Sequence, residues 1–184
     1  MSCTDVNPWY CIEWPKTANN LSITVEVYFA SSVDLITAVP LRTYLRNGMA
    51  EWNVMPARNP YLKEITSTAT DDTYVWASST ALGHCVYAGT AITVSSSNPR
   101  RIVYTDMVFN RNIVWNNDYD FAAYPYPTPC HADARKVATH EFGHVEGLGH
   151  TGISPAVMRQ GAVTYWWAQP NDQSGIVAVY GAYP

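Results

Sequence analysis

Residues 140–150 read His-Glu-Phe-Gly-His-Val-Glu-Gly-Leu-Gly-His and hold three of the five histidines of the 184-residue chain. On a helix, residues four apart stand on one face, one turn from each other, so His140 and His144 can reach one metal ion. If the helix continued, His150 would lie about 15 Å from His140 along its axis and could not join them. The helix must therefore end before His150. Gly147 can end it, because glycine adopts the left-handed C-cap conformation without a Cβ penalty.

The three histidines are the candidate ligands of one catalytic zinc ion. Imidazole nitrogens bind zinc at about 2.0–2.1 Å, and three protein ligands with an open fourth position are typical of catalytic sites. Glu141 follows the first ligand, and its carboxylate can take a proton from zinc-bound water as that water attacks a carbonyl group. The complete HExxHxxGxxH spacing is much more specific than HExxH alone. It therefore outweighs the alternative, in which these histidines only cap or cover a helix.

Hydrophobic periodicity predicts the elements around this motif. Asp133 is a suitable N-cap for a helix that runs to about Gly147. A second helix is expected over about 33–52, where Pro40 kinks or delays it, and a closing helix over 172–183. Alternating β-branched residues predict strands at 21–29, 73–77, 90–94 and 102–110.

Composition and charge exclude several classes of protein. The net charge is −4, and the chain has no Lys/Arg block of the kind that a nucleic-acid binder carries. No apolar run approaches the roughly 18–20 residues that span a bilayer. Charged residues make up 14% of the chain, against about 25% in an average soluble domain, which leans towards an extracellular protein.

Four cysteines, Cys3, Cys11, Cys85 and Cys130, support the same location. Their even number and wide spacing indicate two disulfides, with three pairings open, and no C-x2–4-C pair suggests a structural zinc site. The alternative is four free thiols in a cytosolic protein. The start of the chain has no hydrophobic segment of the signal-peptide kind, so a secreted form would be a mature one whose leader has been removed. The cysteines favour secretion.

The histidine motif resembles the metzincin signature, and its surroundings resemble the matrixin branch, including small secreted bacterial members. In matrixin-like sequences an Asp or Asn stands seven residues before the first ligand, and here Asp133 does. Met158, eight residues after His150, is similar to the methionine of the Met-turn, which lies beneath the metal without binding it. Residues 172–181 resemble the last helix of the family.

This resemblance implies an α+β fold: a twisted, mixed and mostly parallel sheet, an active-site helix and a short C-terminal subdomain. The chain would be one catalytic domain over 1–184, with an upper part of about 1–150 and a lower part of about 151–184. It would be a monomeric zinc-dependent endopeptidase whose protein or peptide substrate lies extended along the edge strand of the sheet.

Two positions depart from related patterns. Gln160 stands where astacin-like and serralysin-like sequences have a tyrosine that can help the oxyanion, which favours the matrixin branch. Glu146 stands where the family usually has an apolar residue. It is interpreted either as a solvated helix position or as a charge that tunes the metal site.

Further metal ions have little support. Vertebrate matrixins bind a second, structural zinc, but only His84 and His131 remain here and neither has a recognisable partner pattern. Calcium is possible but unsupported, because residues 71–72, Asp118 and Asp120 are thin candidates for its oxygen ligands. These acidic residues are better interpreted as turn formers.

In the family, the segment after the Met-turn walls the pocket for the side chain just past the scissile bond. Here that segment contains Arg159, Tyr165, Trp166 and Trp167, which predicts an apolar wall and a preference for large hydrophobic residues. Arg159 could close the floor of the pocket. The alternative is that the tryptophans face the core and only seal the lower part of the domain.

Two other functions compete with an endopeptidase. A catalytically silent zinc-binding interaction module is one, although the presence of Glu141 argues against it. A zinc amidohydrolase that acts on a non-peptide amide is the other, and metal ligands alone do not exclude it because they do not fix the substrate.

Overall fold

A computed structural model of the chain describes residues 12–15, 23–55, 59–116, 130–160 and 165–181. Its helices and strands are β1 Thr24–Phe29, the 3₁₀ helix η2 Ser31–Leu35, α1 Leu41–Asn53, β2 Tyr61–Ile65, β3 Thr73–Ser78, β4 Ala88–Val94, β5 Ile102–Asn110, β6 Val114–Asn116, β7 His131–Asp133, α2 Ala134–Val145 and α3 Pro170–Tyr180.

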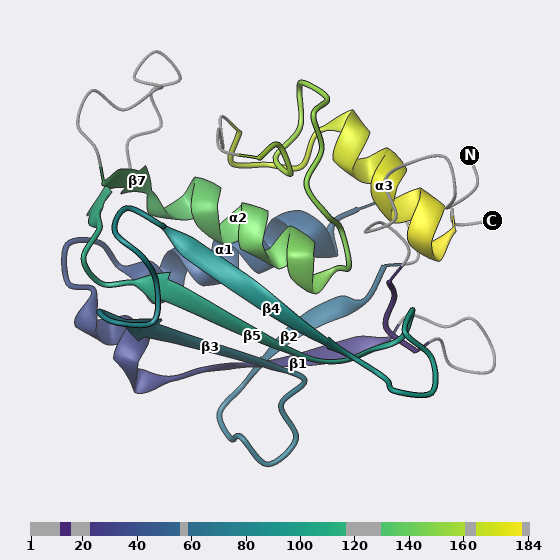
Figure 1. The fold of residues 1–184 in the computed structure, drawn as a ribbon, viewed down its shortest axis with the longest axis horizontal. Helices are drawn as coiled ribbons and strands as arrows, with labels where there is room; N and C mark the ends of the chain where they lie inside the picture. Colours follow the sequence, from purple (N-terminus) through teal and green to yellow (C-terminus); the bar gives the residue numbers. More distant parts are fainter. Residues whose placement is uncertain (1–11, 16–22, 56–58, 117–129, 161–164, 182–184) are drawn as a thin grey trace.

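Five strands form a twisted mixed sheet in the order β2-β1-β3-β5-β4 (Figure 1). Neighbouring strands are parallel except β4, which runs antiparallel to β5 at one edge of the sheet. The short strands β6 and β7 pair in parallel beside it. The antiparallel edge strand matters for function because it borders the site described below.

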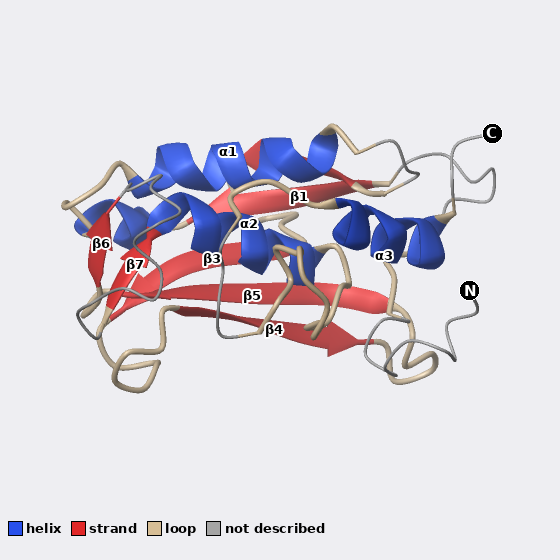
Figure 2. Ribbon diagram, turned by 90° about the horizontal axis from the view of Figure 1, so that it is seen from above, coloured by secondary structure: helices blue, strands red, loops and turns tan. Residues whose placement is uncertain are grey.

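Helices α1 and α2 pack on one face of this sheet, and α3 lies beyond the end of α2 (Figures 1 and 2). Trp52 of α1 is fully buried, and its Nε1 donates to the carbonyl of Thr139 in α2 at 2.8 Å. One hydrophobic core joins strand residues such as Val75 to Phe142 of α2 and Ile176 of α3. Helix α2 is therefore fixed on the sheet, on α1 and on α3.

The α+β fold with a mostly parallel twisted sheet is confirmed, as are the four predicted strands and the closing helix. The single helix expected over 33–52 is wrong in one respect, because the chain forms η2 first and α1 begins only at Leu41. Pro40 precedes α1 and lacks the N–H that would continue a helix through it. Strand β2 was not expected, since Lys63 and Glu64 break the apolar pattern there.

Both ends of α2 agree with the sequence analysis. The Asp133 side chain accepts a hydrogen bond from the backbone N–H of Lys136 at 2.9 Å, which makes it the N-cap. At the other end Gly147 has φ +86°, and a Cβ there would collide with the carbonyl of Ile12. The N–H of Leu148 donates to Gly143 O at 2.9 Å, which completes a Schellman motif and turns the chain back.

Of the predicted disulfides, the described part of the chain contains one, between Cys85 and Cys130. It joins the segment before β4 to the segment before β7. Cys3 and Cys11 lie outside the described residues. No described helix is both long and apolar enough to cross a bilayer.

Candidate metal centre

The three histidines of the motif converge on one point. His150 Nε2 lies 3.1 Å from His140 Nε2 and 3.2 Å from His144 Nε2. On the far side of the rings, His140 Nδ1 lies 2.7 Å from the carbonyl of Val157, and His144 Nδ1 lies 2.7 Å from the carbonyl of Leu148. The helix supplies the first two ligands, and the Schellman turn returns the third to them.

These contacts decide where the ring protons are. A carbonyl oxygen only accepts, so Nδ1 of His140 and of His144 must carry the proton, and both Nε2 atoms are left with lone pairs. Burial, helped by the neighbouring His144, lowers the pKa of His140 to about 3, and burial also lowers the pKa of His150. Imidazoles whose Nε2 lone pairs converge cannot all satisfy one another by hydrogen bonds. This donor set fits a zinc ion, and the two carbonyls are the outer partners that hold such ligands in place.

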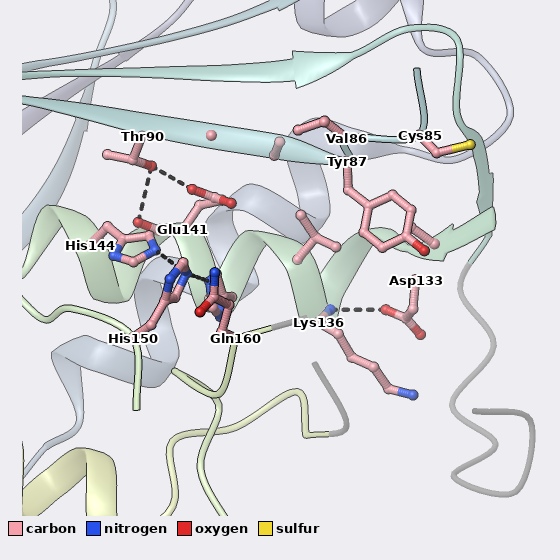
Figure 3. Close-up of a pocket in the computed structure, with 15 residues that line it drawn as sticks. Cys85, Val86, Tyr87, Thr90, Asp133, Lys136, Glu141, His144, His150 and Gln160 are labelled. Carbon is pink, nitrogen blue, oxygen red and sulfur yellow. Dashed lines mark hydrogen bonds between the residues drawn. The ribbon is translucent and has the colours of Figure 1, made fainter. Parts of the chain in front are cut away.

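Glu141 lies beside this set and is 5% exposed. Its Oε2 accepts a hydrogen bond of 2.7 Å from the hydroxyl of Thr90 on β4, drawn in Figure 3. Burial raises the pKa of Glu141, and the charge of His144 and the Thr90 hydroxyl partly oppose that rise. The carboxyl group therefore holds a proton more readily than one in water, which suits a group that must accept a proton and release it.

A cleft passes the histidines on both sides. A cavity of about 710 Å³ extends along Tyr87–Thr90 of the edge-strand region and the facing residues of α2, towards Cys85 of the disulfide (Figure 3). A second cavity, of about 330 Å³, lies against Ile12, Ile92 and Leu148. His144, His150 and Gln160 line both cavities. The candidate metal site thus stands between two spaces that border one strand.

The sequence profile of the matrixin family matches residues 20–181, which is most of the chain. The chain belongs to the matrixin family. Members of this family are zinc metallopeptidases, in agreement with the convergent histidines. No curated protein gives a significant match to this matrixin.

The segment predicted to form the Met-turn of this matrixin packs against α2. Met158 is buried against Gly143, where a Cβ would collide with its sulfur atom. The buried carboxylate of Asp172, at the start of α3, accepts hydrogen bonds from the N–H groups of Val157 at 2.8 Å and of Met158 at 3.1 Å. Asp172 therefore fixes the backbone whose Val157 carbonyl holds His140.

The residues predicted to wall a substrate pocket are placed as follows. The guanidinium carbon of Arg135 lies 3.5 Å from the centre of the Trp166 ring, and the Thr139 hydroxyl donates to Trp166 O at 3.0 Å. Trp167 packs edge-on against Trp166 and Tyr165. Among the described residues that line the 710 Å³ cavity, Gln160 is the one from this segment, and Arg159, Tyr165, Trp166 and Trp167 are not in its wall. The pocket assignment stays a prediction.

Glu146 is not a solvated helix position, because its side chain is completely buried. Neither carboxylate oxygen has a hydrogen-bond partner among the described residues. Burial raises the pKa of this carboxyl group well above its ordinary value, and the nearby side-chain amide of Asn59, although not placed for a hydrogen bond of good geometry, partly opposes the rise. A charged residue near a helix end is usually solvated, but Trp14 and Tyr180 close over this end of α2 through bonds to Val145 O and Glu146 O.

The other described residues considered as metal ligands do not converge as the three histidines of the motif do. His84 Nδ1 lies 3.2 Å from Cys85 Sγ, so this histidine sits beside the disulfide, and His131 belongs to no cluster of metal-binding groups among the described residues. Asp72 accepts from the backbone N–H of Glu26 at 2.8 Å, a contact with β1 across 46 positions rather than a bond within a turn. Asp118 and Asp120 lie outside the described residues.

Sequence reasoning missed two residues that bear on the site, Thr90 and Asp172. For Asp172 a local signal existed, since Pro170 at the first helical position and an acid two residues later are typical of a capping box, which the structure contains around Gln169. For Thr90 none existed, because its contact spans 51 positions of the sequence.

Proposed function

We propose that this matrixin is a zinc endopeptidase in which His140, His144 and His150 hold the metal and Glu141 is the general base. The observation that carries the proposal is that three convergent imidazoles and one buried carboxylate face the same cavity. Zinc held by these imidazoles would supply Lewis acidity to the scissile carbonyl and to the attacking water.

The protein's own groups account for the movement of the proton. As the water oxygen bonds to the carbonyl carbon, Glu141 accepts a proton from that water. When the carbon–nitrogen bond breaks, the same carboxyl group gives the proton to the departing amine. The raised pKa of Glu141 favours the first step, because it makes the carboxylate a stronger base towards the water, and the fixed tautomers of His140 and His144 would keep their Nε2 atoms as ligands throughout.

Cleavage inside a chain, rather than at its end, is favoured by the shape of the cleft. Space lies on both sides of the histidines, so a peptide can continue past the site in both directions. Strand β4 stands at the edge of the sheet and can pair with an extended peptide through its backbone. An enzyme that trims chain ends would instead need one side closed.

We further propose that the protein acts as a secreted monomer built as one catalytic domain. All proposed catalytic and ligand groups come from one chain, and a disulfide such as Cys85–Cys130 persists in oxidising surroundings. The intact mass before and after reduction tests for the two predicted disulfides, because reduction of both would add four hydrogens to the chain. Light scattering tests the oligomeric state.

The decisive experiment incubates the zinc-loaded protein with a diverse peptide mixture, with and without chelator, and identifies the products by mass spectrometry. Internal cuts that chelator abolishes support an endopeptidase. Absence of any cut supports the silent interaction module, and hydrolysis restricted to N-acyl amides supports the amidohydrolase. The positions of the cuts also test the predicted preference for a large hydrophobic residue after the scissile bond.

Two variants separate metal binding from catalysis. Glu141→Ala should keep one zinc per chain and lose hydrolysis, whereas His144→Ala should lose both. Zinc content is measured by elemental analysis of the purified proteins. Near-full activity of the Glu141→Ala protein would show that the general base is another group.

A further inference from the structure

A hydroxyl on the edge strand contacts the carboxylate that we assign as the general base. Thr90 Oγ1 lies 2.7 Å from Glu141 Oε2 and 3.4 Å from the backbone carbonyl of Glu141. Figure 3 shows Thr90 directly opposite Glu141, on the side of the carboxylate away from His150. The shorter contact is a hydrogen bond in which the hydroxyl must donate, because an ionised carboxylate only accepts.

This bond makes the two oxygens of Glu141 different. Oε2 is held by Thr90, while no described residue donates to Oε1. The carboxylate would otherwise rotate about its last side-chain bond, which is a broad and weakly hindered torsion. A partner on one oxygen restricts that rotation and leaves the other oxygen to meet the attacking water.

The backbone around Thr90 is suited to this role. Thr90 pairs with Met107 on β5, so the strand that carries the hydroxyl is anchored to the sheet. Glu141 sits on α2, which packs against β4 and whose first residues are capped by Asp133. Two rigid elements thus present the donor and the acceptor to each other, which is the arrangement that holds a catalytic group within a fraction of an ångström.

We propose that Thr90 is a positioning residue that holds Glu141 Oε2, so that Oε1 is the oxygen that takes the proton from water and returns it to the amine. This inference rests on the proposed function. The Thr90 hydroxyl keeps its own proton throughout, and no other bond changes. A second consequence follows from its place on the edge strand: the residue that orients the base belongs to the strand along which the peptide is proposed to lie.

The test compares Thr90→Val, which removes the hydroxyl at nearly constant shape, with Thr90→Ser, which keeps it. Thr90→Val should lower kcat about 10- to 100-fold, since a displaced base costs a large part of the roughly 10²–10⁴-fold that general-base catalysis supplies. KM should change by less than about 2-fold, because the lost contact acts only during the reaction. Thr90→Ser should restore kcat to within about 3-fold of the original protein. Thr24→Val makes the same chemical change at an exposed position of β1, away from the proposed substrate strand, and should alter neither constant.

Two readouts do not depend on turnover of substrate. The zinc content of the Thr90→Val protein should stay at one per chain, and its crystal structure should show the Glu141 carboxylate rotated or in two positions while the histidines are unchanged. In a Glu141→Gln background, Thr90→Val should cause no further loss of residual activity, because Thr90 acts only by orienting the carboxylate that Glu141→Gln already removes.

The outcomes distinguish this inference from the proposed function. If the unaltered protein with zinc cuts no peptide, the proposed function fails. If it cuts peptides and the Thr90→Val protein keeps its kcat, or if Thr90→Ser is as impaired as Thr90→Val, only the role of Thr90 is overturned. An equal loss from Thr90→Val with and without Glu141 would also overturn it, because Thr90 would then act independently of the base.

Discussion

Asp172 is expected to control both the stability of the protein and its affinity for zinc. Its carboxylate is 3% exposed and accepts three backbone hydrogen bonds, from Val157 at 2.8 Å, Met158 at 3.1 Å and Gln169 at 2.8 Å. Asp172→Ala would leave three N–H donors without this acceptor.

The magnitude follows from these contacts. A hydrogen bond to a charged group contributes about 1.5–3 kcal/mol. Burial raises the pKa of Asp172, which shows that desolvation offsets part of that sum. We therefore expect Asp172→Ala to lower the free energy of unfolding by about 3–5 kcal/mol. Asp172→Asn should cost about 1.5–3 kcal/mol, because an amide oxygen at the Oδ2 position keeps the bonds from Val157 and Gln169 and loses only the one from Met158.

The effect should reach the metal site through one carbonyl. Val157 lies between Asp172, which binds its N–H, and His140, whose Nδ1 donates to its oxygen. Removal of an outer partner of a metal ligand typically lowers metal affinity about 10–100-fold. Because Asp172 acts through the Val157 backbone, we expect a loss near the lower end of that range, about 10-fold.

Urea denaturation in the presence of chelator measures stability without zinc, and competition with a fluorescent chelator measures zinc affinity. Asn171→Ala is the matched control, since the half-buried Asn171 donates a solvent-exposed side-chain hydrogen bond to the carbonyl of Pro155 in the same loop. The control should change stability by less than about 0.5 kcal/mol. If Asp172→Ala lowers stability and leaves zinc affinity equal to that of the control, the proposed coupling through Val157 is refuted.

Three further predictions concern other parts of the fold. Glu146→Leu should raise the free energy of unfolding by about 1–3 kcal/mol in urea denaturation, because it removes a buried carboxylate without a described partner; a loss of stability would contradict this. Gly143→Ala should lower it by about 1–3 kcal/mol, because a Cβ collides with Met158; an unchanged urea midpoint would show that the methionine can move aside. The hydrogen bond from Arg46 lowers the pKa of Glu64 below 4.5 in the folded protein. The ionised Glu64 therefore stabilises the fold above pH 4.5, and this contribution is lost as the pH falls through the pKa of Glu64 in the folded state. Glu64→Gln should therefore reduce the steepness of the acid side of the stability curve, and an identical curve would mean that this exposed pair contributes nothing.

The local sequence was sufficient to predict that the three histidines converge and that one helix carries two of them. His140 and His144 share a helix face because of their spacing alone, and Gly147 must end the helix if His150 is to reach the same ion. Asp133 could be assigned as the N-cap because capping depends on neighbours in the chain. The four expected strands could be found because their alternation survives in a half-buried sheet, whereas β2, with Lys63 and Glu64, does not display it.

Tertiary structure alone decided which residues surround those ligands. Glu146 carries no local sign of burial, and it is enclosed only because Trp14 and Tyr180, both remote in sequence, bond to the end of α2. The contact between Thr90 and Glu141 likewise depends on how the edge strand packs beside the helix. Helix periodicity and capping act between residues a few positions apart, so they can be read along the chain. Burial and the orientation of a catalytic side chain depend on contacts between distant segments, and these are fixed only when the sheet and helices pack together.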